Sequence, residues 1–380
     1  MKSQRNLIDK FYCYTLLILA ALYYSQGVVL PDGEGVGLAV LVFIFGISFY
    51  YLIKMLLSKK KFTGFMTVWL LFTIMNSFYF LLYDDYTQYG LIKMVLLNFL
   101  PFFPFYYFSE KGILTRNHLI AFFLFLLPVL VVKFIRSIHE LRLEEMNEDV
   151  VDNTIYMFIG LLPFVFFFKK KLFSLLFLMI IWFFMIQSAK RAAILCGIVA
   201  LALFVFEYIY TSESKSKIKR YIFSAVLLFG VSYFGYNLYT QNQFLIERMQ
   251  GMLQGESSGR DMLVETLLKV WYDADNLIRY LFGFGYNASR LHSVHVSHND
   301  WVDMLVSFGL LGFMIYFALF RLLFKQVFNK NWSRDKKVIL ILVVSIACIT
   351  SLTSRWYLST FAYMQFLILP YLLATHEDNV

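Results

Sequence analysis

The sequence predicts an all-α, polytopic integral membrane protein with about twelve membrane-spanning helices and one large extracytoplasmic loop. Hydrophobic residues make up 60% of its 380 residues and charged residues only 16%. A soluble globular chain is closer to half apolar and a quarter charged. Apolar runs of about 20 residues, the length that crosses a bilayer as a helix, recur along the chain. This composition excludes a disordered chain, a fibrous repeat and an ordinary cytosolic enzyme.

Twelve apolar segments are candidate spans: residues 11–30, 37–57, 62–83, 91–108, 117–134, 155–168, 172–187, 192–210, 221–240, 299–320, 338–351 and 354–374. The sixth and eleventh are short for a full crossing, and ten spans would remain without them. The first span follows Lys2, Arg5 and Lys10. It is long and lacks a small-x-small cleavage site, so we interpret it as an uncleaved signal anchor.

The basic residues between the spans predict the orientation of the chain. Loops on one side, including the N-terminus, carry 21 of the 34 lysines and arginines, and loops on the other side carry ten. The positive-inside rule places the first set and both termini in the cytoplasm. Eighteen of the 25 acidic residues fall on the outer side. Because the basic residues are dispersed as topology signals, the net charge of +9 does not indicate a nucleic-acid partner.

The chain divides into spans one to nine (1–240), a large outer loop (241–298) and spans ten to twelve (299–380), which we expect to form one integrated domain. Within the loop, five apolar residues recur at helical spacing: Leu263, Val264, Leu267, Leu268 and Trp271. They predict an amphipathic helix that lies on the membrane or caps the bundle. Ser258 and Asp261 resemble the capping box that begins a helix. Residues 135–154 predict a short acidic helix or loop.

Three basic residues on the outer side are candidates for anion binding. Lys190 and Arg191 lie in a tight turn between two apolar runs, where positive charge opposes the topology signal. They either contact an anion or extend to the interfacial water, as such side chains commonly do. Arg260 falls in the first turn of the predicted helix, where a cation is unfavourable unless an anion binds there. Local neutralisation by Asp261 is the alternative.

Three histidines, His292, His295 and His298, lie within seven residues at the start of span ten. Their side chains suit either zinc binding or general-base chemistry near neutral pH. The spacing of three residues turns around a helix rather than converging on one ion, which favours the base. Because His298 precedes Asn299 and Asp300 where a span must begin, these polar groups predict a cavity rather than a lipid-facing surface.

The segments GFGYN (283–287) and SHNDWVDMLVSFGLLG (297–312) resemble the signature of the O-antigen ligase and polymerase superfamily. In that family an outer His-Asn pair precedes a span with a Gly-x-x-Gly end, here Gly309 and Gly312. The segments Ser258–Arg260 and Ser188–Arg191 resemble the two arginine motifs of the family, in the same order and on the same side. Two residues separate Ser188 and Arg191, whereas many members have Ser-Arg.

The resemblance implies a GT-C-like glycosyltransferase of the bacterial inner membrane that inverts the anomeric carbon at the periplasmic face, without a metal or another cofactor. The implied donor is a glycan on undecaprenyl pyrophosphate. Arg191, with Lys190, and Arg260 would hold the pyrophosphate, and His298 would take the proton from the acceptor hydroxyl. Further candidates for positioning phosphate or sugar are Arg248, Arg279, Arg290, His295, Asn299, Asp300 and Tyr286. Tyr286, Trp271 and Trp301 could also stack on sugar rings, with core packing as the alternative.

Two activities fit this resemblance. A polymerase transfers the growing glycan to the next lipid-linked repeat unit of an O-antigen or capsule, which HNDWVDML favours, whereas a ligase transfers it to lipid A–core. A chain-length regulator and a flippase are the partners that the family implies. A lipid-linked glycan transporter is a different class, which would place charges mid-membrane along a pathway. Here the charges concentrate at the outer face, so we expect a transferase.

Overall fold

The computed structural model describes residues 2–30, 34–58, 62–82, 89–145, 152–188, 190–211, 217–241, 246–247, 250–251, 260–293 and 297–374. Its helices are α1 (Lys2–Tyr24), α2 (Glu34–Leu56), α3 (Gly64–Leu82), α4 (Tyr89–Phe99), α5 (Phe102–Glu110), α6 (Arg116–Glu145), α7 (Ile155–Leu161), the 3₁₀ helix η2 (Leu162–Phe167), α8 (Lys171–Gln187), α9 (Arg191–Thr211), α10 (Lys217–Gln241), α12 (Arg260–Tyr272), α13 (Leu277–Phe282), α14 (Ala288–Leu291), α15 (Asp300–Val327), α16 (Arg334–Thr353) and α17 (Ala362–Ala374). No β-strand occurs in these ranges.

The prediction of an all-helical, multi-pass membrane protein is supported by the length and composition of these helices. Among the described residues, eight segments are long and apolar enough to cross a membrane: Leu7–Tyr24, Gly35–Leu56, Gly64–Leu82, Tyr89–Glu110, Arg116–Leu143, Arg191–Tyr210, Asp300–Val327 and Arg334–Thr353. Three shorter apolar segments, Ile155–Phe167, Lys171–Gln187 and Ala362–Ala374, accompany them. Each of the twelve segments predicted from the sequence overlaps a helix.

Several predicted boundaries differ from the structure. The span expected at 91–108 is divided at Pro101 into α4 and α5, because proline lacks the N–H that would continue the helix. The span expected at 117–134 continues to Glu145 as part of α6, since residues 139–145 (HELRLEE) are mostly strong helix formers. The span expected at 338–351 is longer, running from Arg334 to Thr353. The last span is shorter: α17 begins only at Ala362, and residues 354–361 form a non-helical connector.

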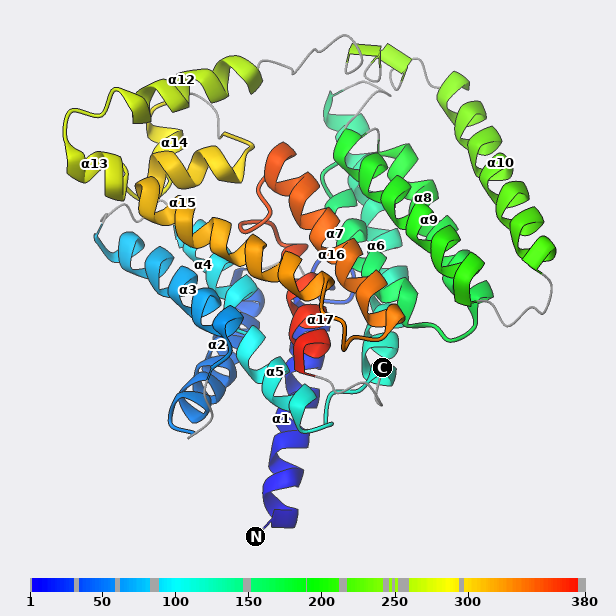
Figure 1. Ribbon diagram of the computed structural model, residues 1–380, viewed down its shortest axis with the longest axis horizontal. Helices are drawn as coiled ribbons and strands as arrows, with labels where there is room; N and C mark the ends of the chain where they lie inside the picture. Colours follow the sequence, from blue (N-terminus) through cyan, green and yellow to red (C-terminus); the bar gives the residue numbers. More distant parts are fainter. Residues whose placement is uncertain are drawn as a thin grey trace.

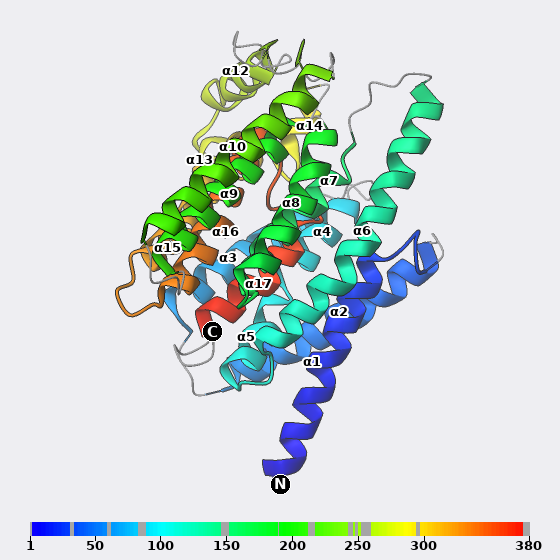
Figure 2. The same ribbon diagram turned by 90° about the vertical axis from the view of Figure 1, so that its right-hand side faces the viewer.

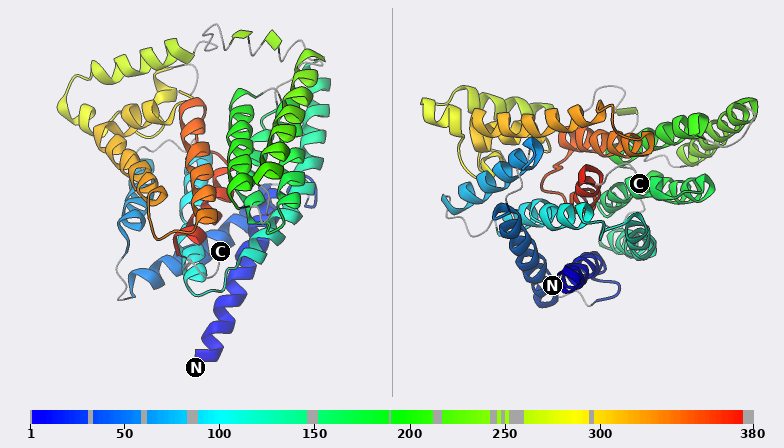
Figure 3. Two further views of the ribbon diagram at one scale, coloured as in Figure 1. Left: turned by 45° about the vertical axis from the view of Figure 1, so that its right-hand side comes forward. Right: turned by 60° about the horizontal axis from the view of Figure 1, so that its bottom comes forward.

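The helices form a bundle whose two ends differ (Figures 1 and 2). Helices α12, α13 and α14 lie at one end, and the N-terminus of α1 lies at the opposite end. We call the first the α12 end; α9 and α15 begin there and α16 ends there. Helices α8, α9 and α10 lie side by side (Figure 3), and α9 also packs against α16.

The amphipathic helix predicted in the outer loop is α12, and it caps the bundle. Leu267 on its apolar face is fully buried, in a cluster with Val302 and Val306 of α15. Leu263, Val264 and Trp271 pack against the same cluster, whereas Leu268 remains partly exposed. This contact fixes the outer loop to the first turns of α15, where the predicted histidine site lies.

Candidate functional site

His298 occupies a strained turn immediately before α15. Its φ angle is +48°, a left-handed conformation that non-glycine residues rarely adopt. Asn299 follows as the N-cap, and its side-chain oxygen accepts hydrogen bonds from the backbone N–H groups of Trp301 (3.0 Å) and Val302 (3.3 Å). The cap uses the amide of Asn299 to begin the helix. The side-chain oxygen of Asn299 therefore caps α15, and the left-handed residue His298 leads directly into that cap.

Asp300, the first residue of α15, is buried and ties this helix to the 354–361 connector. Its Oδ2 atom accepts hydrogen bonds from the hydroxyl of Tyr316 and from the backbone N–H of Trp356, both at 2.8 Å. Trp356 is itself fully buried and donates through its indole N–H to Gln365 (2.9 Å). The position expected to line a cavity is thus part of a buried network that begins two residues after His298.

One helical turn later, Asp303 is the centre of a second set of buried contacts. Its carboxylate accepts from the hydroxyls of Tyr357 (2.6 Å) and Ser289, and it lies 3.4 Å from the guanidinium of Arg355. Arg355 also donates to Asn287 (3.1 Å) and Ser289 (3.0 Å). We define these residues together with Asp300 as the polar cluster: Asn287, Ser289, Asp300, Asp303, Arg355 and Tyr357.

The electrostatics of the polar cluster keep Arg355 charged and the tyrosines protonated. Burial would lower the pKa of Arg355, but the Asp303 carboxylate and its neighbours raise it above the ordinary value. Burial and then the charge of Asp303 raise the pKa of Tyr286 and of Tyr357. Tyr357 therefore keeps its proton and donates a hydrogen bond to Asp303, in a place where an isolated charge would be costly.

Three buried polar atoms at this cluster have no hydrogen-bond partner among the described residues: Asp300 Oδ1, Arg355 Nε and the hydroxyl of Tyr286. Such atoms are uncommon in protein interiors and call for water or a ligand. They indicate that the cluster is incompletely satisfied by the protein itself.

The glycines of the two sequence motifs dock the outer loop onto a break in α15. Gly309 has a φ angle of +66° inside that helix, and the loop N–H groups of Phe284 and Gly285 bond to the carbonyls of Val306 (2.8 Å) and Ser307 (3.1 Å). A Cβ atom on Gly309 would lie 2.4 Å from the Leu281 backbone. Glycine is therefore required at position 309 because the backbone of the outer loop approaches closely and the φ angle is positive.

Arg260 is the first residue of α12 and lies over the end of α16. Its guanidinium donates to the carbonyl oxygen of Thr353 (2.8 Å), the last residue of α16, where a cation is favourable. Thr353 lies two residues before Arg355 of the polar cluster. The position at a helix start agrees with the prediction, whereas Ser258, its predicted cap, lies outside the described residues.

The second basic motif lies on the other side of α16, at the start of α9. Arg191 is the first residue of α9 and is half-buried. The ammonium of Lys190 lies 5.7 Å from the ring centroid of Tyr156, and that ring stacks on Phe361 of the connector at 5.7 Å. Because α12 lies at the α12 end and both α9 and α15 begin there, the two basic motifs and His298 share that end of the bundle.

The remaining predicted residues have varied surroundings. Arg279 is exposed, with Asp275 at 3.3 Å and the Phe284 ring at 5.5 Å, and Arg290 is exposed at the end of α14. Trp271 stacks on Tyr280 (4.3 Å) and Trp301 packs among Phe313, Tyr316 and Phe320, so both take part in packing. Arg248 and His295 lie outside the described residues.

Within the described ranges, no group of three or more histidine, cysteine, aspartate or glutamate side chains is placed to hold a metal ion. The zinc alternative needs His295, which is outside those ranges. His292 is exposed, and its ring contacts Phe284 edge-on at 5.1 Å.

An apolar groove of about 800 Å³ runs between α3, α13 and α15. Its walls include Phe78, Phe282 and Leu311, which are 56%, 46% and 44% exposed and so face the surroundings of the bundle. Arg279 and His292 are among its few polar lining residues. The groove thus combines a long apolar wall with polar groups of the outer loop.

Sequence reasoning missed Asp303, Arg355 and Tyr357. Two carboxylates three residues apart at the start of an apolar span were a usable signal, because they lie on one face of the helix and ionisable residues in a span have partners. Arg355 was counted only as a loop charge.

Compared with protein-family models and with curated proteins, the chain matches none.

Proposed function

We propose that the protein is a membrane glycosyltransferase that polymerises lipid-linked oligosaccharide units on the extracytoplasmic side of the membrane. The donor is a glycan on a polyprenyl pyrophosphate, and the acceptor is a hydroxyl of the next lipid-linked unit. The observation that carries the proposal is the arrangement around His298. This residue is held at a positive φ above buried carboxylates, at the bundle end where α9 and α12 each begin with an arginine.

In the proposed reaction His298 is the general base. The acceptor oxygen attacks the anomeric carbon while the bond from that carbon to the pyrophosphate oxygen breaks. The acceptor proton passes to the imidazole, and the polyprenyl pyrophosphate leaves with the bonding electrons. Attack and departure on opposite faces invert the anomeric carbon. A histidine suits this step because its ordinary pKa is near neutrality.

The arginines at the α12 end would stabilise the leaving group. Negative charge grows on the pyrophosphate as the glycosyl bond breaks, and fixed cations lower the energy of that charge. Arg260 is positioned through its bond to Thr353, and Arg191 begins α9 on the other side of α16. Guanidinium groups match pairs of phosphate oxygens. Lys190 would add a third positive charge to this end.

The apolar groove between α3, α13 and α15 is suited to the polyprenyl chain of the donor. Its apolar walls are partly exposed, as a lipid-contacting surface requires. Arg279 and Asn276 of the outer loop line the same groove, where they would meet the polar head of the lipid. The polyprenyl chain would then leave the groove beside α15, the helix that His298 directly precedes.

The test uses purified protein in liposomes with a single lipid-pyrophosphate repeat unit as the only substrate. A polymerase makes a ladder of products without any second acceptor, and His298→Ala abolishes that ladder. A single product that forms only after lipid A–core is added would identify a ligase instead. If neither substrate is consumed by the wild-type protein while labelled lipid crosses the bilayer, the protein is a transporter and the proposal is wrong.

A further inference from the structure

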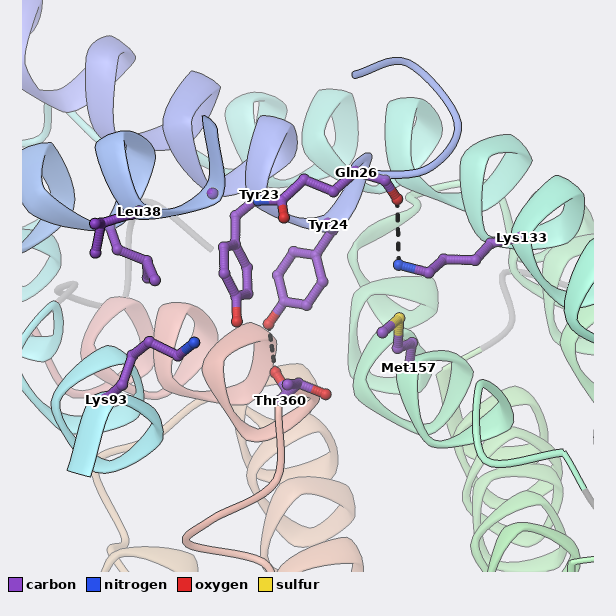
Figure 4. A pocket seen from close by; sticks show the side chains of 10 residues that line it. Tyr23, Tyr24, Gln26, Leu38, Lys93, Lys133, Met157 and Thr360 are labelled. Atoms are coloured by element: carbon purple, nitrogen blue, oxygen red, sulfur yellow. Dashed lines mark hydrogen bonds between the residues drawn. The ribbon is translucent and has the colours of Figure 1, made fainter. Parts of the chain in front are cut away.

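A polar cavity lies away from the polar cluster, between α1, α2, α4, α6 and α7 (Figure 4). Its volume is about 530 Å³. Lys93 of α4 and Lys133 of α6 line it together with Tyr23, Gln26 and Thr360 of the connector. Figure 4 shows the two ammonium groups directed into the space from opposite sides, with the tyrosine rings between them.

The polar groups that this cavity offers are mainly hydrogen-bond donors. Lys93 and Lys133 are its two charged lining residues, and both are half-buried. The side-chain nitrogen of Gln26 is buried and has no acceptor among the described residues. Ammonium and amide N–H groups donate and do not accept. A ligand that fits this lining therefore presents several acceptor oxygens and carries negative charge.

Specific contacts keep these donors in place. The Lys133 ammonium donates to the backbone oxygen of Gln26 (3.3 Å), and Arg136, one turn further along α6, donates to the backbone oxygen of Gly27 (2.7 Å). The Gln26 side chain lies so close to Gly37 that a Cβ there would be 2.8 Å from its oxygen. The turn after α1 is thus held against α6 by two backbone carbonyls, and the Gln26 side chain packs closely against α2.

The connector links this cavity to the site of the proposed reaction. Thr360 lines the cavity, and its backbone oxygen accepts from Tyr24. Three residues earlier, Tyr357 donates to Asp303 in the polar cluster. Met157, which also lines the cavity, follows Tyr156, whose ring contacts Lys190. The cavity is therefore a neighbour of the proposed site and separate from it in lining residues.

We propose that this cavity binds the phosphate group of a lipid and, on the basis of the proposed function, that this lipid is the acceptor glycolipid with its pyrophosphate. A polymerase must hold two lipid-pyrophosphate substrates at once, and one set of arginines serves only the donor. Two lysines and a buried amide supply charge-assisted donors for the second pyrophosphate. Lys93 and Lys133 lie in two of the segments that could cross a membrane, and ionisable residues in such segments commonly mark a functional site.

The experiment measures binding directly, on the full-length protein in nanodiscs of phosphatidylcholine. The probe is a fluorescent polyprenyl pyrophosphate without sugar, so binding does not depend on catalysis. We expect Lys93→Gln and Lys133→Gln each to weaken the binding of the probe about tenfold, as loss of one charge-assisted contact predicts. Lys269→Gln, at an exposed position of α12, removes the same charge outside the cavity and should leave binding of the probe unchanged.

Because the donor site also binds the probe, it is blocked first by the Arg191→Ala and Arg260→Ala substitutions in every variant compared. Residual binding that requires both lysines supports the cavity, and Lys93→Arg with Lys133→Arg should retain it in a folded protein. Residual binding that persists in the double glutamine variant overturns the proposal. The same holds if the blocked protein binds no probe at all.

A second arm identifies the source of the phosphate. Phosphatidylglycerol added to the nanodiscs competes weakly if the cavity selects the pyrophosphate. If it displaces the probe at equal concentration, the cavity holds an ordinary anionic lipid and the acceptor assignment is wrong. If the cavity binds the probe but the protein never makes a ladder, the binding site is supported and the polymerase function is refuted. The two failures are thus distinguishable.

Discussion

The left-handed turn at His298 allows the chemistry of this residue to be separated from its place in the fold. Replacement by alanine removes the imidazole but keeps a Cβ at a φ angle of +48°. Replacement by glycine removes the imidazole and the Cβ together. If His298 is the general base, both variants lose transfer to the same extent, and they differ only in stability.

The size of this difference follows from the backbone. A residue with a Cβ in the left-handed region costs about 1–2 kcal/mol, whereas glycine loses about 0.5–1 kcal/mol more than alanine in backbone freedom on folding. The glycine variant should therefore be more stable than the alanine variant by about 0.5–1 kcal/mol. Loss of a general base lowers the rate by about 10²–10⁴-fold, and this factor should be the same in both.

The assay combines thermal unfolding in detergent with ladder formation in liposomes. His139→Ala, which changes an exposed histidine on α6, serves as the control and should leave both readouts unchanged. Transfer at the wild-type rate in the glycine variant would remove His298 from the chemistry. Equal melting temperatures of the glycine and alanine variants would refute the strained turn and leave the base assignment to be decided by the rates alone.

Three further variants test the surroundings of the site. Asp303→Asn leaves the Arg355 charge without its ion-pair partner, so the free energy of unfolding should fall by about 3 kcal/mol. Adding Arg355→Met removes the unpaired charge and should recover part of this loss in the same thermal-unfolding assay. Gly309→Ala inserts a Cβ into the loop backbone and should expose the outer loop to protease, whereas Gly46→Ala, in open space, should not. Arg260→Lys keeps the charge but not the two-pronged guanidinium, so the transfer rate should fall at least about tenfold; an unchanged rate would limit this residue to a charge effect.

Apolar periodicity was sufficient to predict the helices but not where they break. The α12 helix was predicted together with the face that it buries, because Leu263, Val264 and Leu267 recur at helical spacing. The break of α15 at Gly309 was not predicted, since a glycine inside an apolar run is compatible with a continuous helix. The break depends on the docking of Phe284 and Gly285, which are distant along the sequence from Gly309.

For the candidate site, the sequence indicated at which end of the bundle its residues lie but not which side chains contact one another. His298, Arg191 and Arg260 all lie at the α12 end, as expected from their place beside outer loops. Nothing local to Arg355 reveals that it pairs with Asp303, because the pair joins segments 52 residues apart. Asn299 was a candidate for substrate contact, and the sequence did not reveal that its side-chain oxygen caps α15.

The eight-residue connector 354–361 contacts both proposed binding sites, the one at His298 and the lysine-lined cavity. Asn98 of α4 donates to the carbonyls of Tyr357 (2.8 Å) and Ser359 (3.0 Å), while Trp356 donates to Asp300 below His298. The connector is thus bonded to α4 through the carbonyls of Tyr357 and Ser359 and to the first residue of α15 through the N–H of Trp356. We infer that the connector is non-helical because its backbone groups at Trp356, Tyr357 and Thr360 bond to three different helices, α15, α4 and α1. In a continuous helical span those groups would bond within the helix, and the connector would not join the lysine-lined cavity, through Thr360, to α15, through Trp356.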